Sequence, residues 1–182
     1  MITLALLLLT APASASFEKA TAAATDAYRA DFQAEHGLAA PDPLGFFLES
    51  EEDEILSTVY FVKDGALAAD VYGCHSHGPE EFDCHREDRK QLGAYERSTS
   101  LYSAAEMRQS VPLALEFFAG VAPGAEVTSL KLWEAQENIR YVVGYRQNGQ
   151  TKTYFLACHR HGAGIDCHRK RDAGPGQPGS GQ

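Results

Sequence analysis

The sequence lacks a run of apolar residues long enough to cross a membrane. Its apolar N-terminal stretch covers only Ile2 to Leu9, whereas a membrane-spanning helix needs about 20 such residues. The chain also lacks a G-x-S-x-G sequence, a glycine-rich phosphate-binding loop and a C-x-x-C-H haem attachment sequence. Nothing in the sequence therefore points to an enzyme.

Basic residues are scarce in the first half of the chain. The net charge is −9; residues 1–90 hold 17 acidic but only 6 basic residues, whereas residues 91–182 hold 8 acidic and 10 basic ones. An acidic chain of this kind is a poor binder of nucleic acids. The uneven charge would orient a protein partner or help one half dock on the other, although a solvated acidic face is the simpler interpretation.

The N-terminus is typical of a secretory signal peptide. The short apolar run is followed by Ala13-Ser14-Ala15, an A-x-A cleavage site, so we expect residues 1–15 to be removed and the mature chain to begin at Ser16. The alternative is a buried N-terminal helix, which the small residues of this site argue against. No cysteine directly follows the run, so a lipid anchor of the bacterial type is not expected. We therefore predict a secreted or periplasmic protein.

Cysteine and histidine are concentrated in two copies of one motif. Residues 74–86 read CHSHGPEEFDCHR and residues 158–169 read CHRHGAGIDCHR; together they hold all four cysteines and six of the seven histidines. Only His36 lies outside. The pairs Asp64-Gly65 and Asn148-Gly149, typical of hairpin turns, precede the two motifs at the same offset. This repetition predicts a tandem duplication of a small module.

The cysteines are even in number, and in an exported protein this predicts disulfide bonds. Four cysteines allow three pairings, and the matched motifs favour pairing within each copy, Cys74 with Cys84 and Cys158 with Cys167. Each bond would close a small loop and stabilise the chain by about 2–3 kcal/mol.

Hydrophobic periodicity predicts an α+β fold in which one helix and four antiparallel strands occur twice, with the helices packed on the sheet and one disulfide-closed hairpin in each module. We expect a first module over 16–90, a linker over 91–102, a second module over 103–172 and a disordered Gly/Pro tail over 173–182. The predicted helical stretches are 17–36 and 103–119; the predicted strands are 44–48, 55–62, 67–74, 82–86, 127–133, 139–146, 151–158 and 165–169.

Local signals refine these elements. Gly37 is expected to end the first helix, Ser103 and Glu106 form a capping box, and Pro112 predicts a kink or two short helices with Ser110 capping the second. The acidic run 49–54 lacks the spacing of a calcium loop and predicts a solvated connection. Tandem modules of this kind resemble, in architecture alone, the secreted β-lactamase inhibitor proteins, and the chain carries none of their sequence motifs.

The motif predicts a cluster of imidazoles on one face of each hairpin. If Cys74 lies opposite Cys84, then His75 lies opposite Asp83, and strand alternation brings the other motif histidines to the same face, away from the disulfide. Three imidazoles and a carboxylate are suited to bind Zn²⁺ or Cu²⁺, at two sites or at one shared site between the modules. The predicted ligands are His75, His77, His85 and Asp83 in the first copy and His159, His161, His168 and Asp166 in the second.

Other interpretations stay open. The motif residues are alternatively polar groups on exposed hairpins, with Asp83 and Asp166 paired to histidine or to Arg86 and Arg169. A Cys–His zinc site conflicts with export, and paired cysteines leave no thiol for catalysis. The sequence thus favours a non-enzymatic binding protein for a transition metal, with a protein-interaction module that uses the histidine loops as its contact surface as the alternative.

Overall fold

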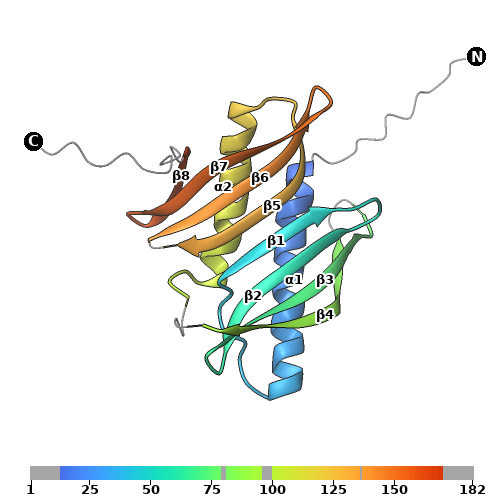
Figure 1. Cartoon of the computed structure of the whole chain (residues 1–182), viewed down its shortest axis with the longest axis vertical. Helices are drawn as coiled ribbons and strands as arrows, with labels where there is room; N and C mark the ends of the chain where they lie inside the picture. The colour runs from blue at the N-terminus through green and yellow to red at the C-terminus, as the bar shows by residue number, and fades with distance from the viewer. Residues whose placement is uncertain (1–12, 79–80, 96–99, 136, 170–182) are drawn as a thin grey trace, which may run out of the picture.

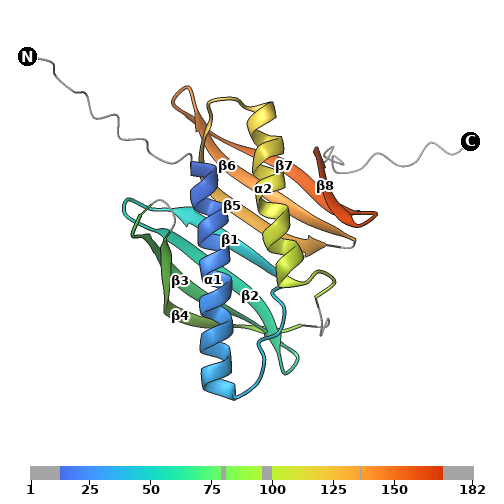
Figure 2. The ribbon, with the colours of Figure 1, turned by 180° about the vertical axis from the view of Figure 1, so that it is seen from behind.

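The computed structural model describes residues 13–78, 81–95, 100–135 and 137–169, and two helices lie on one face of an eight-stranded antiparallel sheet (Figures 1 and 2). The elements of the first half are α1 (Ala13–His36), β1 (Gly45–Ser50), β2 (Ile55–Lys63), β3 (Ala66–Ser76) and β4 (Phe82–Ala94). The elements of the second half are α2 (Ala104–Val121), β5 (Glu126–Ala135), β6 (Asn138–Gln147), β7 (Gln150–His161) and β8 (Gly164–Arg169). The predicted α+β class is therefore confirmed.

The eight strands form one continuous sheet in the order β4-β3-β2-β1-β5-β6-β7-β8. Each half is an antiparallel meander, and the halves join where β1 pairs with β5, from Gly45 opposite Trp133 to Glu49 opposite Ser129. A Cβ atom at Gly45 would lie 2.4 Å from the carbonyl oxygen of Leu132, so the close approach of the two strands at this seam requires glycine. The duplication itself stays a prediction.

The core lies between the helices and the sheet. The residues spaced along α1 that the sequence predicts as its apolar face are buried, with exposures of 4% or less: Phe17, Ala20, Ala24, Tyr28 and Phe32. Helix α2 contributes Met107, Val111 and Phe118 to the same cluster. Helices of this kind gain their stability from the burial of such a face rather than from intrinsic propensity.

Helix ends and hairpin turns follow the local signals in the sequence. Gly37 adopts a left-handed backbone and donates its N–H to the carbonyl of Gln33, which ends α1. The side chains of Ser103 and Glu106 form the predicted capping box of α2. Asp64-Gly65 and Asn148-Gly149 have positive φ at both residues, as a type I′ turn requires.

Two expectations about these elements are wrong. The alternative of two short helices does not hold, because α2 is one helix that runs through Pro112. Ser110 does not cap a second helix; its hydroxyl donates to the carbonyl of Met107 and contacts the hydroxyl of Tyr141. Strand β4 does not end at Arg86 but continues to Ala94, because its polar residues face solvent at the sheet edge while Arg89 reaches the buried Asp70. Residues 1–12 of the predicted signal peptide 1–15, and the whole of the predicted tail 173–182, lie outside the described residues.

Candidate functional site

A disulfide crosses each outer hairpin, between Cys74 and Cys84 and between Cys158 and Cys167, which are the pairings that the matched motifs predict. The paired cysteines are directly opposed in the β3–β4 and β7–β8 ladders. Cys74 and Cys158 are fully buried against the helices, so the neighbouring histidines project from the opposite face of the sheet. Disulfides of this kind are typical of proteins that fold outside the cytoplasm.

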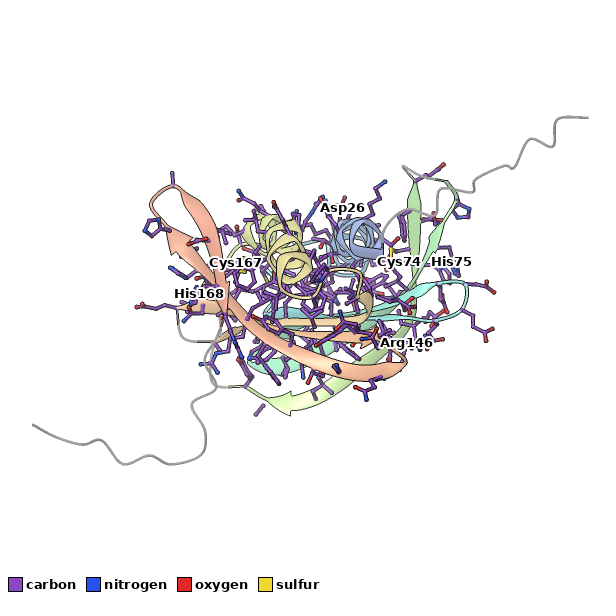
Figure 3. The ribbon with its side chains drawn as sticks, turned by 90° about the horizontal axis from the view of Figure 1, so that it is seen from above. Asp26, Cys74, His75, Arg146, Cys167 and His168 are labelled. Atoms are coloured by element: carbon purple, nitrogen blue, oxygen red, sulfur yellow. A yellow bond between two sulfur atoms is a disulfide. The ribbon has the colours of Figure 1, made fainter. Side chains whose placement is uncertain are left out.

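The two histidine clusters lie at opposite ends of the sheet. Strands β3 and β4 form one edge and β7 and β8 form the other, and Figure 3 shows His75 and His168 on opposite sides of the molecule. The expectation that both sets meet at one shared site between the modules is therefore wrong. Within one chain, a site built on these histidines therefore draws on one cluster and not on both.

In the first hairpin, the rings of His75 and His85 stack with centroids 5.2 Å apart and planes at 11°. Each ring has a carboxylate beside it: His75 Nε2 lies 3.3 Å from Glu54 Oε2, and His85 Nε2 lies 3.8 Å from Glu87 Oε1. The sequence did not predict either glutamate. Glu87 lies beyond the end of the predicted strand 82–86, and Glu54 belongs to the acidic run 49–54 that the sequence predicts as a solvated connection.

Both glutamates reach over Gly73, which lies opposite His85 in the ladder. A Cβ atom at position 73 would lie 2.6 Å from Glu54 Oε2 and 2.7 Å from Glu87 Oε1. The Glu54 Oε2 atom is buried and accepts no hydrogen bond, although His75 Nε2 lies within ion-pair distance of it. Two carboxylates and two imidazoles therefore surround one glycine on the helix-free face.

In the second hairpin, the ring of His159 lies between two others, with centroid distances of 5.0 Å to His168 and 6.4 Å to His161. The Nδ1 atom of His159 is buried without a hydrogen-bond partner. The position opposite His168 is Ala157, where the first hairpin has glycine. Within the described ranges, no carboxylate forms an ion pair with these three rings.

The remaining predicted ligands do not join the rings. Asp83 lies opposite His75 in the ladder, and Asp166 lies opposite His159, yet Asp166 accepts a hydrogen bond from the backbone N–H of Cys167. His77 lies in the turn, where its N–H donates to the carbonyl of Glu81. Among the residues that the structure describes, no three His, Cys, Asp or Glu side chains are placed to hold a metal ion together.

Arginines tie the hairpins to the helices on the other face. Arg86 and Arg89 of β4 both bind the carboxylate of Glu35 in α1, and these hydrogen bonds lower the pKa of Glu35 to about 2. Arg160 of β7 donates to Glu106 of α2 at 2.5 and 2.9 Å and lowers the pKa of Glu106 to about 2. Arg86, which the alternative interpretation pairs with Asp83, thus contacts the helix instead.

No family model matches the chain, and no curated protein sequence matches it either. Among solved structures, the chain is similar to a Clostridium difficile 630 protein described as a candidate lipoprotein. The two share 11% sequence identity over 78% of this chain and 89% of that one, with a TM-score of 0.47. In the part of the chain that the structure describes, neither helix has the length and apolar character needed to span a membrane.

Proposed function

We propose that this chain is a non-enzymatic protein of the extracytoplasmic space that binds a transition metal ion at each of its two disulfide-closed hairpins. The observation that carries the proposal is the pairing of imidazoles in both halves. His75 with His85, and His159 with His168, bring ring centroids to 5.2 and 5.0 Å on the helix-free face of the sheet. The repeated motif and the repeated element order also support the origin of the halves by duplication.

The chemistry of the paired rings supports a transition metal. Neutral imidazole is a common ligand of Zn²⁺ and Cu²⁺, and Cu²⁺ binds a given set of nitrogen ligands more tightly than Zn²⁺ does. In each hairpin the two rings come from adjacent strands, and the disulfide between those strands holds their register. The backbone that carries the ligands is thus ordered before the metal arrives, which lowers the entropic cost of binding.

Calorimetric titration of tag-free protein, stripped of metal, with Zn²⁺ and Cu²⁺ at neutral pH tests this proposal. We expect two equivalents of metal to bind more tightly than the millimolar range. Because the clusters lie at opposite edges of the sheet, the double variant His75→Ala/His85→Ala should lose one of the two equivalents. His36→Ala, which changes the one histidine outside the motifs, is the matched control and should bind as the parent does.

The proposal fails if neither metal binds more tightly than the millimolar range, or if the His36 variant loses as much metal as the hairpin variant. A stable fold without metal would favour the second function, a protein-interaction module. The helix-free face supports this second function, since one row across the sheet carries Phe47, Lys131, Val142 and Phe155. The Phe155 side chain is 43% exposed, and such exposed apolar groups often mark contact surfaces.

A further inference from the structure

The two hairpins differ in their supply of carboxylates, although their motifs match. In the first, Glu54 and Glu87 flank the histidine pair, and both reach over Gly73. In the second, the residue opposite the third histidine is Ala157, where the first hairpin has Gly73. Asn138 comes directly before Ile139, which pairs with Cys158, just as Glu54 comes directly before Ile55, which pairs with Cys74. The difference lies outside the repeated motif, so the motif alone gives no sign of it.

We infer that Glu54 and Glu87 complete the metal site of the first hairpin, which therefore binds a divalent cation such as Zn²⁺ through two imidazoles and two carboxylates. The inference rests on the proposed function and adds two ligands that lie outside the motif. The second hairpin, whose site has imidazoles alone, is then a different site with a different preference for metals.

The distance within each His–Glu pair is close to the distance between two ligand atoms of one metal ion. In a tetrahedral Zn²⁺ site with bonds of about 2.0–2.2 Å, two ligand atoms lie roughly 3.3–3.6 Å apart. The separation between His75 Nε2 and Glu54 Oε2 is 3.3 Å, within this range, and that between His85 Nε2 and Glu87 Oε1 is 3.8 Å, slightly above it. The same two carboxylate oxygens are those closest to the Cβ position of residue 73, so the pairs face each other across one small space.

The backbone places Glu87 at this space by a β-bulge. Tyr72 pairs with Arg86 and Val71 pairs with Asp88, which leaves Glu87 without a partner in the ladder. The extra residue allows Arg86 and Arg89 both to face α1, while Glu87 stays on the face of His85. Gly73 then provides the room, because any side chain there would displace the carboxylates.

The electrostatics of the cluster also favour a cation. One Glu54 oxygen is buried and accepts no hydrogen bond, with the His75 ring 3.3 Å away, and burying an oxygen without a hydrogen bond is costly. The carboxylates of Glu54 and Glu87 also repel each other across the small space above Gly73. A bound cation would offset this repulsion and would give the buried Glu54 oxygen a partner. Without the ion, the four side chains form two His–Glu contacts and do not converge on one point, so ligation requires side-chain rotation on a fixed backbone.

Calorimetric titration with Zn²⁺ in a His159→Ala/His168→Ala background, which removes the second site, tests the inference. Glu54→Gln and Glu87→Gln keep the side-chain shape and remove the charge. Each should weaken Zn²⁺ binding by about tenfold or more. The matched controls are the exposed neighbours, Glu52→Gln and Asp88→Asn, which should leave the affinity unchanged.

A second variant tests the geometry rather than the charge. Gly73→Ala should weaken Zn²⁺ binding as the glutamine variants do, because its Cβ meets both carboxylates. The inference is overturned if the Glu54 and Glu87 variants bind Zn²⁺ as the background protein does, or if the controls lose as much affinity. Failure of the proposed function gives a different result, since the background protein itself would then not bind Zn²⁺ more tightly than the millimolar range.

Discussion

The ion pair between Asp70 and Arg89 is the contact whose loss should destabilise the protein most clearly. Asp70 is completely buried, and its two oxygens accept hydrogen bonds of 2.6 Å from Nε and Nη2 of Arg89. Removing one partner of a buried pair costs about 3–5 kcal/mol, because the other charge is left buried without compensation. Arg86 Nη1 remains 3.8 Å from Asp70, so we expect the lower value, about 3 kcal/mol, for Arg89→Met.

Urea denaturation followed by circular dichroism, with the disulfides intact, measures this cost. The matched control is Arg108→Met, which removes an ion pair with Asp26 whose side chains are 36% and 65% exposed. An exposed pair of this kind contributes at most about 1 kcal/mol. The double variant Asp70→Asn/Arg89→Met should lose less stability than the sum of the two single variants, because the buried charge is removed together with its partner.

The reasoning is refuted if Arg89→Met costs no more than Arg108→Met, or if the two substitutions at the buried pair are additive.

Two further predictions concern the hairpins and their attachment. The disulfides close loops of 10 and 9 residues, so reduction of both should lower the free energy of unfolding by about 5 kcal/mol; urea curves with and without reductant that coincide would contradict this. Arg160 lowers the pKa of Glu106 from 4.5 to about 2, so the stability from this pair is present above pH 4.5 and is lost as the pH falls towards 2. In Glu106→Gln, the free energy of unfolding should therefore depend less on pH between 4.5 and 2 than in the parent protein. The prediction is wrong if both proteins lose the same free energy of unfolding over this range.

The elements that the sequence predicts well are those governed by local rules. Asp64-Gly65 and Asn148-Gly149 mark their turns because both residues of the turn need a left-handed backbone. The pairing of Cys74 with Cys84 follows from the two matched motifs, and the side of the sheet on which the histidines lie follows from strand alternation. These features need no knowledge of distant parts of the chain.

The seam between β1 and β5 has no such local signal. From the sequence, β1 and β5 could each have been the outer strand of a separate module. Their pairing depends on tertiary packing, in which both helices lie on one sheet. Once β1 and β5 are known to pair, the close approach of their backbones explains the glycine at position 45. The glycine alone, however, does not indicate which strand lies beside it.

The two glutamates beside the histidine pair could not be predicted for a related reason. The run from Glu87 to Lys90 is highly charged and is typical of a linker, yet it continues β4 because Asp70, buried in β3, needs the guanidinium of Arg89. A tertiary contact thus overrides the local composition. Once β4 is known to continue past Arg86, strand alternation places Glu87 on the same face of the sheet as His85.

The bulges of β4 also affect how the molecule behaves towards copies of itself. A long, regular edge strand offers its free N–H and C=O groups to another strand and so promotes edge-to-edge aggregation. In β4, Glu87 and Leu92 each interrupt the ladder with β3, and the strand is rich in charged residues, while the opposite edge, β8, spans only Gly164–Arg169. An eight-stranded sheet with two open edges is thereby protected from growing into a fibril.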